Sequence, residues 1–406
     1  MHRPLIGLLA SSFIAISAAL AAQQSTPPQA TFKAGVDLIL IEATVLDKDG
    51  RPVADLQARD FSIKLAGKTR TVAVAEYIPA GKGGAAAVGA MAATPTASTP
   101  GPSGTASVDI ARAQLGGSER TIILAVDVDN IRSGAGRNAL VDVAEYVATL
   151  PPTDRIGIMT LPGGGTTVEP TDDRAAVRAA LSRMAGTDHR IDSCEATIGE
   201  AAAEAVNDDR GWDSFNRRVF IPRCPRTRGA TTHRDLQVFV PIYRVQAKQT
   251  LGTLTSLAKN LGAVPGRRVI VLVSEGLYMD DEVIRDLPAF GAALERSRVV
   301  LYAIHLDFPL SEASAERTSS DTRLLDDRYG FDAMANAAFF GGGAAIRAVS
   351  RATPAITRID SELSGTYLLG IESLPTDAAG KALEVKVEVS RKGTEVRTRR
   401  NITISK

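Results

Sequence analysis

The chain has few of the residues that build most metal and redox sites. Its 406 residues include two cysteines, four histidines and one tryptophan, and aromatic residues make up 5% of the sequence. The histidines lack the spacing of a zinc site, both among themselves and with the cysteines. An excess of one charge is lacking too, because 47 basic and 46 acidic residues leave a formal net charge of +1. The composition therefore excludes a whole-molecule field that would steer the chain to nucleic acid or an acidic membrane.

The two cysteines follow an N-terminal segment that is typical of export. Residues 1–21 have a basic start, an uncharged apolar stretch and small residues before the expected cleavage point, the pattern of a signal peptide. Leu5–Ala22 is just long enough for an uncleaved anchor, which is the alternative; no later segment predicts a transmembrane helix. We expect a periplasmic or secreted chain, in which Cys194 and Cys224 pair in a disulfide or stay as two buried thiols.

The first part of the mature chain predicts strands followed by a linker. Residues 32–80 alternate apolar and polar side chains, with turn residues at Asp49-Gly50 and Ala66-Gly67, which favours a hairpin-rich β segment. Residues 81–118 are expected to form a flexible linker, because the stretch 83–107 has no charge and consists almost entirely of Gly, Ala, Ser, Thr and Pro.

Residues 119–364 have a different pattern, in which continuous apolar runs alternate with helical stretches. The runs include "TIILAV", "RIGIMTL", "GRRVIVLVSEG" and "SRVVLYAIHLD", and one helical stretch is Asp281–Arg296. Continuous apolar strands separated by helices predict a doubly wound, mostly parallel α/β sheet that is covered on both faces. Residues 365–406 alternate again. Because a β segment with only a few strands is marginally stable on its own, we expect the N- and C-terminal β segments to form one small β-sandwich.

Three carboxylates follow the ends of two predicted strands. Asp127 and Asp129 end the run "TIILAVDVDN", and Glu275 ends "IVLVSEG". Open α/β sheets bind ligands at the carboxyl ends of their strands, where gathered acids need a cation, a proton or an arginine to balance them. The alternative is that Asp129 and Asn130 only turn the chain and cap the next helix.

Several motifs together resemble a known family. They are "ATVLDKDGRPVADLQARDFSIKLAGK", "TIILAVDVDN", "PGRRVIVLVSEG", "GTYLLGIES" and "VKVEVSRKGTEVRTRRNITI". The layout resembles the bacterial secreted VWFA-related family, in which a von Willebrand factor A domain lies between β segments. The resemblance covers nearly the whole mature chain except the linker and an insertion at residues 188–245. It implies a non-enzymatic module of the protein-binding or adhesion type.

The resemblance also implies a metal-ion-dependent adhesion site, in which DxSxS, a distant Thr and a distant Asp hold the cation. Asp127 matches the first Asp, Asp129 stands at the first Ser, Glu275 replaces the distant Asp, and Thr187 is the candidate Thr. The chain departs from the pattern at Ile131, which replaces the second Ser and has no oxygen to donate. The added carboxylate of Asp129 would suit Mg²⁺ or Ca²⁺.

An enzymatic alternative rests on the same residues. Asp127-Val-Asp129 after an apolar strand resembles the opening of haloacid-dehalogenase-type phosphohydrolases, in which the first Asp attacks phosphorus and the second is the general acid. Ser274 would then be the hydroxyl of the second strand. The match is incomplete at Ile131, and the later run "AIHLDF" contains only Asp307 where the family has an acidic pair.

The insertion at residues 188–245 is not explained by the family. Its stretch "RGWDSFNRRVFIPRCPRTRGATTHR" has seven arginines and the only tryptophan. Such a patch favours an anionic glycan or an acidic protein surface, so a protein partner is expected either here or at the carboxyl edge of the sheet. The alternative is neutralisation within the chain by Glu200, Glu204 and Asp208, just upstream.

Overall fold

The computed structural model describes residues 38–80, 120–132, 135–163, 165–188, 195–219, 233–307, 324–349, 351–377 and 380–404. These residues all lie within one compact unit, Gly35–Lys406. The predicted signal peptide, the predicted linker, Cys194 and Cys224 lie outside the described residues. Among the described helices, none is both long enough and apolar enough to cross a membrane.

A six-stranded sheet forms the centre of the α/β part, in the order β10-β9-β8-β5-β6-β7. Its strands are β5 (Arg120–Asp127), β6 (Arg155–Leu161), β7 (Gly165–Thr171), β8 (Arg267–Ser274), β9 (Val299–Asp307) and β10 (Gly342–Val349). Every neighbouring pair is parallel except β6 and β7, which are antiparallel. The prediction of a mostly parallel sheet is therefore confirmed.

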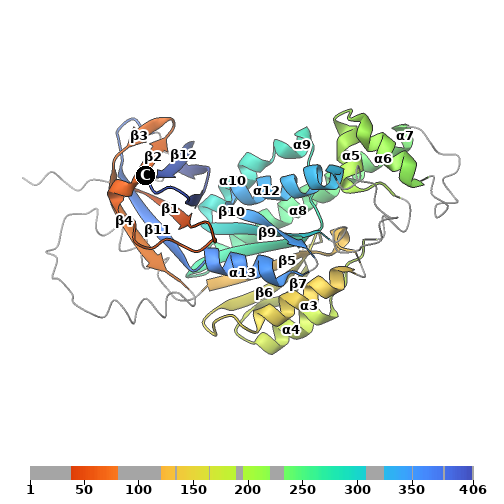
Figure 1. The fold of residues 1–406 in the computed structure, drawn as a ribbon, viewed down its shortest axis with the longest axis horizontal. Helices are drawn as coiled ribbons and strands as arrows, with labels where there is room; N and C mark the ends of the chain where they lie inside the picture. The colour runs from red at the N-terminus through yellow and green to blue at the C-terminus, as the bar shows by residue number, and fades with distance from the viewer. Residues whose placement is uncertain are drawn as a thin grey trace, which may run out of the picture. The chain divides into compact units, whose positions relative to one another are not determined.

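Helices cover both faces of this sheet, as Figure 1 shows. One face packs against α8 (Phe239–Leu261), α10 (Leu287–Arg296) and α12 (Asp332–Phe340); the other packs against α3 (Ala135–Val147), α4 (Arg174–Arg183) and α13 (Thr353–Glu362). Every residue of β5, β8 and β9 is buried, and alternate residues of each strand enter the two cores. Each buried Val, Leu or Ile contributes roughly 1.5–3 kcal/mol, which is why these runs are continuously apolar.

Strands from both ends of the chain pair with one another in two further sheets. They are β1 (Leu38–Leu46), β2 (Phe61–Leu65), β3 (Lys68–Arg70), β4 (Val72–Pro79), β11 (Gly365–Glu372), β12 (Ala382–Val389), β13 (Glu395–Thr398) and β14 (Asn401–Thr403). The orders are β13-β1-β11-β4 and β14-β12-β2-β3. Both sheets contribute to one hydrophobic cluster, in which the ring of Tyr367 packs 5.0 Å from that of Phe61.

Two predicted turns have the expected backbone. Ala66 and Gly67 connect β2 to β3 with φ angles of 49° and 77°, the left-handed pair of a two-residue hairpin. Gly50 also has a left-handed φ of 76° and lies in the loop that follows β1. Turn residues at both places are therefore confirmed. A short 3-10 helix, η1 (Ala58–Asp60), then leads into β2.

Other elements differ from the sequence expectation. The predicted helical stretch 281–296 is two helices, α9 (Asp281–Ile284) and α10. Pro288 lies in the first turn of α10, a position that favours the start of a helix. Strand β10 was not predicted, since its sequence "GGAAIRAV" is rich in Gly and Ala. The 188–245 segment contains α5 (Ile198–Ala205), α6 (Asp209–Val219), α7 (His233–Gln237) and the start of α8.

Candidate functional site

Asp127 is the last residue of β5 and is fully buried at the carboxyl edge of the sheet. Its Oδ2 atom accepts a hydrogen bond from the Nδ2 group of Asn130 at 2.8 Å. The hydroxyl of Ser274, the last residue of the neighbouring β8, lies 2.9 Å from the same Oδ2 atom. The carboxylate of Asp127 therefore connects the ends of two strands with the turn between β5 and α3.

Asp129 lies in that turn, a 3-10 helix η2 (Val128–Asn130), and is half-buried. The exposed Thr187 donates from Oγ1 to Asp129 Oδ1 at 2.9 Å, and its backbone N–H donates to the Val128 carbonyl at 2.8 Å. These contacts bring the segment after α4 to the end of β5. The structure thus brings together Asp129 and the candidate threonine.

Glu275 follows β8 and forms an ion pair with Arg132. One carboxylate oxygen of Glu275 lies 2.6 Å from the backbone nitrogen of Arg132, and the other lies 2.6 Å from its Nε atom. The Glu275 side chain is 9% exposed and that of Arg132 is 23% exposed. Burial raises the pKa of Glu275, and the charge and hydrogen bonds of Arg132 oppose that rise. Arg132 is the arginine that balances this acid, and sequence reasoning missed it.

These residues do not fit a divalent cation in the described arrangement. The predicted ligands are Asp127, Asp129, Thr187 and Glu275. Asp127 binds Asn130 and Ser274, Asp129 binds Thr187, and Glu275 binds Arg132. Within the described ranges, no group of three His, Cys, Asp or Glu side chains is placed to hold a metal ion. A guanidinium on Glu275 also opposes binding of Mg²⁺ or Ca²⁺ by charge repulsion.

The buried position of Ile131 explains why residue 131 is not the second Ser of the adhesion-site pattern. Ile131 is fully buried and belongs to the core that covers the α3 face of the sheet. A Cβ atom on Gly136 would lie 2.1 Å from Ile131 Cγ2, so a glycine in α3 makes room for this side chain. Position 131 therefore packs the core, and an oxygen ligand is absent there.

His305 lies beside Ser274 on the next strand, and sequence reasoning did not single it out. The two residues are register partners in the parallel β8–β9 pair. His305 is 3% exposed. Burial and then the nearby charge of Arg347 lower the pKa of His305 to about 4, so the ring is neutral near pH 7. Its position two residues before the end of the predicted strand, in "AIHLD", was the available sequence signal.

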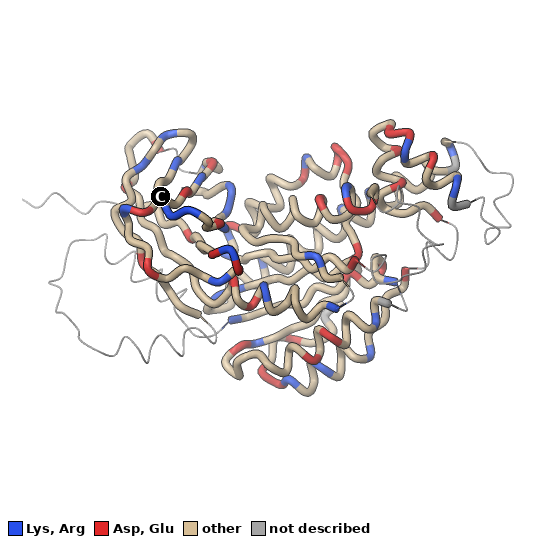
Figure 2. The backbone as a smooth tube through the Cα atoms, in the orientation of Figure 1, with Lys and Arg blue, Asp and Glu red and all other residues tan. Residues whose placement is uncertain are grey.

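Further acids at this edge are also bound within the chain. Arg347 of β10 lies 2.6 Å from an oxygen of Asp307 and 2.5 Å from one of Asp327, the first residue of the π-helix η5 (Asp327–Phe331). Asp326 accepts a hydrogen bond from the backbone N–H of Gly199 at 2.8 Å. Burial and then the charge of Glu200 raise the pKa of Asp326 to about 6. Figure 2 shows both signs of charge interspersed along the described chain.

The described part of the insertion shows some neutralisation within the chain. Arg210 lies 2.7 Å from Asp208. Glu204 lies 3.2 Å from the Nδ1 atom of His233, whose ring stacks on Trp212. The hydroxyl of Ser214 donates to Glu200 at 3.0 Å. The stretch 220–232, with three of the seven arginines, lies outside the described residues.

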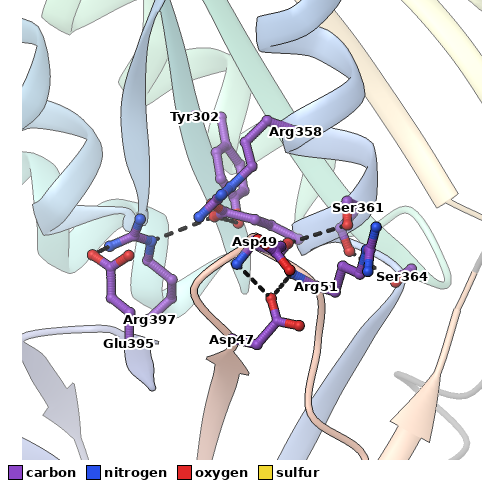
Figure 3. Close-up of polar contacts among 11 residues, drawn as sticks. Asp47, Asp49, Arg51, Tyr302, Arg358, Ser361, Ser364, Glu395 and Arg397 are labelled. Atoms are coloured by element: carbon purple, nitrogen blue, oxygen red, sulfur yellow. Dashed lines mark hydrogen bonds and ion pairs between the residues drawn. The ribbon is translucent and has the colours of Figure 1, made fainter. Parts of the chain in front are cut away.

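The motif "DKDGRP" joins the β segments to the α/β part, as Figure 3 shows. Asp47 accepts hydrogen bonds from the backbone N–H groups of Asp49 and Arg51 at 2.9 and 2.8 Å, which closes the turn. The carbonyl of Gly50 then accepts a hydrogen bond from Ser361 of α13 at 3.1 Å. The motif that carries the resemblance most specifically therefore contacts α13. It lies away from the acidic edge, which is the carboxyl edge of the sheet where Asp127, Asp129 and Glu275 follow β5 and β8.

A buried glutamate lies under the same junction. Glu362, the last residue of α13, is fully buried and contacts Arg358 at 2.8 Å, Tyr302 of β9 at 3.2 Å and Arg397 of β13 at 3.4 Å. Burial and the charge of Glu362 raise the pKa of the Tyr302 hydroxyl. These contacts connect α13, the central sheet and a C-terminal strand through one carboxylate.

Comparison with known proteins adds little to this geometry. No model of a known protein family matches the chain, and no curated protein matches it. Among solved structures, the VWA domain of SpRpn10 is 12% identical to this chain and has a TM-score of 0.23. The match covers 57% of this chain and 88% of the SpRpn10 chain. A likeness of this size carries no conclusion about family, partner or activity. The strand order and the helical layers themselves are compatible with a VWA-like or Rossmann-like fold.

Proposed function

We propose that this chain is an exported, non-enzymatic protein-binding module that binds its partner at the carboxyl edge of the central sheet. The observation that carries the proposal is the ion pair between Arg132 and Glu275, with both contacts at 2.6 Å. It fixes the segments after β5 and β8, at the edge where open α/β sheets bind ligands. A preordered surface of this kind loses little entropy when a partner binds.

Arg132 supplies the positive charge that a divalent cation supplies in the adhesion site of the resembling family. The proposal is supported by its position between the ends of the two strands and by its charge, which balances Glu275. Binding would then be independent of Mg²⁺ and Ca²⁺. An acidic edge without a divalent cation favours a partner that donates hydrogen bonds or carries positive charge.

Asp129 is the side chain that we assign to the partner's lysine or arginine. It is half-buried, and Thr187 donates to its Oδ1 atom. A carboxylate has about four acceptor positions, so Asp129 keeps capacity for a further donor while Thr187 holds its orientation. Charge-assisted hydrogen bonds of this type are about twice as strong as neutral ones.

The burial of Asp127 supports the non-enzymatic role over the phosphohydrolase alternative. Asp127 is 0% exposed, and its Oδ2 atom is engaged by Asn130 and Ser274. A nucleophile of a phosphohydrolase must reach phosphorus at a near-attack distance of roughly 3–3.5 Å. Turnover of p-nitrophenyl phosphate by the wild type that disappears in Asp127→Asn would overturn this part of the proposal.

A photo-cross-linking experiment tests the binding surface. A photoreactive residue at Thr187, in the full chain in its own cells, should give a discrete adduct, and Asp129→Lys should remove the adduct by charge repulsion. The matched control places the same residue at the exposed Lys259, near the C-terminal end of α8. Equal adducts from both positions, or an adduct that survives Asp129→Lys, would place the binding surface elsewhere.

We also propose that the chain is periplasmic or secreted, that Cys194 pairs with Cys224, and that the two smaller sheets act as one β-sandwich. The sandwich is supported by the hydrophobic cluster that both sheets share. Cell fractionation and intact mass spectrometry before and after reduction test the first two points. An unprocessed N-terminus on a cytoplasmic chain with two free thiols would contradict them.

A further inference from the structure

One half of β1 has an open edge. The segment Leu38–Ala43 pairs with β11, whereas β13 pairs only with Ala43–Leu46. Among the described strands, none pairs with Leu38–Glu42 on the β13 side. The hydroxyl of Thr398 donates to the Glu42 carbonyl at 2.9 Å, which shows that the main-chain groups of Glu42 face this side.

The same side must hold main-chain groups of two leucines. Backbone N–H and C=O groups alternate in direction along an antiparallel strand, so those of Leu40 and Leu38 point the same way as those of Glu42. A row of unpaired strand groups is a template for another strand. The open edge therefore offers main-chain hydrogen bonds to an extended peptide.

A cavity of about 650 Å³ lies along this open edge. Its walls are Leu38–Glu42 of β1, the end of β13, β14 and the C-terminal end of α10. The volume lies within the range of roughly 300–1,000 Å³ that is typical of ligand pockets. Because Arg298 directly precedes β9, the cavity lies at the amino end of the central strands, opposite the acidic edge.

Arg399 and Glu295 line the cavity, and contacts within the chain hold both side chains in place. Arg399 Nη2 donates to the Val299 carbonyl, and Glu295 Oε1 accepts from the backbone N–H of Thr403.

The charges and apolar side chains of the cavity define the sequence that it fits. The exposed Arg296 lines the cavity, Glu42 forms an ion pair with Arg399, and Glu295 accepts a hydrogen bond from the backbone N–H of Thr403. The half-buried Leu38 and Leu40 supply apolar surface. Acidic side chains that alternate with apolar ones would therefore match both features.

We propose that this cavity binds an extended segment of a partner protein, with alternating apolar and acidic residues, as an added strand beside Leu38–Glu42. This binding mode gives affinity through main-chain hydrogen bonds and specificity through alternate side chains. The surface is separate from the acidic edge, so Arg296→Glu should leave the cross-link at Thr187 unchanged.

Fluorescence polarisation with two labelled peptides tests the proposal. The full chain should bind acetyl-Val-Asp-Val-Asp-Val-amide, and acetyl-Val-Lys-Val-Lys-Val-amide should bind at least tenfold more weakly. Arg296→Glu should weaken the acidic peptide about tenfold, which corresponds to about 1.4 kcal/mol. The matched control, Arg285→Glu, changes an exposed arginine that does not line the cavity and should have no effect. Equal binding of both peptides, or no binding of either, would overturn the proposal.

Residue-resolved amide hydrogen exchange identifies the occupant of the edge. In the free chain the amides of Leu38 and Leu40 should exchange quickly, and the acidic peptide should protect them. Ile39 and Ile41, whose amides face β11, should be protected in both states. Protection of Leu38 and Leu40 without peptide would overturn the proposal. If that protection does not depend on protein concentration, a segment of the same chain covers the edge. If it does depend on protein concentration, a second copy of the chain covers the edge. Binding without new protection would place the peptide elsewhere.

Discussion

Arg132 and Glu275 contact each other twice, through the backbone nitrogen and the Nε atom of the arginine, at 2.6 Å in each case. They are separated by 143 residues in the chain, and the parallel pairing of β5 with β8 brings them together. The pair explains how an acid can remain buried at the end of a strand. A guanidinium supplies the opposite charge there.

Arg132→Met should destabilise the chain by about 2 kcal/mol at pH 7, because it leaves the Glu275 carboxylate buried without its cation. The loss should be below that of a fully buried pair, since Arg132 is partly exposed. The pKa of Glu275 is already raised, and it should rise further in the variant. A raised carboxyl pKa costs stability above that pKa, so the deficit should shrink as the pH falls from 7 to 5. Urea denaturation at both pH values measures it.

Arg137→Met is the matched control for this variant, because Arg137 is an exposed arginine of α3. It should change the free energy of unfolding by no more than about 0.5 kcal/mol. Adding Glu275→Gln to Arg132→Met should remove the pH dependence of the deficit. A deficit that is equal at both pH values would contradict the role of Glu275.

Asp326→Asn should flatten part of the pH dependence of stability. The pKa of Asp326 is raised to about 6 from an ordinary value of 3.8, because the carboxyl is buried and close to Glu200. Between these two pKa values the folded chain holds a proton that the unfolded chain has lost. As the pH falls from 7 to 5, Asp326 therefore adds about 1 kcal/mol to the free energy of unfolding. Denaturant titrations of wild type and variant across this range check the prediction. Parallel pH profiles for the two proteins would rule it out.

His305→Leu should change the pH dependence of stability in the opposite direction from Asp326→Asn. Burial lowers the pKa of His305 to about 4 from an ordinary value of 6.5, so below pH 6.5 the unfolded chain takes up a proton that the folded chain resists. The stability that neutral His305 contributes above pH 6.5 is lost as the pH falls toward 4. Relative to wild type, the variant should gain about 2 kcal/mol on moving from pH 7 to pH 5. Thermal melts in the same buffers test this, and a constant difference would refute it.

Gly50→Ala should destabilise the junction more than Gly67→Ala. Both glycines have a left-handed φ, of 76° and 77°, so each substitution carries a backbone cost of roughly 1–2 kcal/mol. At Gly50 a Cβ atom would also lie 1.8 Å from Cζ of Arg358, whereas at Gly67 it would meet nothing within 4 Å. The additional loss at Gly50, about 1 kcal/mol, arises because Arg358 must leave Glu362. Equal losses in chemical denaturation would show that Arg358 adjusts freely.

The central sheet was predictable because its core strands are continuously apolar. β5, β8 and β9 are buried on both faces, so their sequences have no polar alternation that would hide them. The hairpin at Ala66-Gly67 was predictable for a local reason, the left-handed backbone. β10 was not, since Gly and Ala give little strand signal and parallel pairing with β9 decides its conformation.

At the acidic edge, the sequence located the acids, Thr187 and Ser274, but it did not locate Arg132. Strand ends placed Asp127 and Glu275 at one edge, and the resemblance placed Thr187 near Asp129, as observed. Arg132 and His305 were missed because their importance depends on contacts with residues far away in sequence. The family motif around Gly50 gave no guide to this edge, because it contacts α13.

Thermal melts with and without 5 mM Mg²⁺, Ca²⁺ or Mn²⁺ test the central claim, that Arg132 replaces a divalent cation at this edge. A cation bound with a dissociation constant of about 50 μM would stabilise the folded chain by about 2.7 kcal/mol at this concentration. The account predicts that the Tm of the wild type stays unchanged with each metal, and that Arg132→Ser, which frees Glu275, becomes sensitive to at least one of them. A metal-dependent rise in the Tm of the wild type that disappears in Asp127→Asn would contradict it.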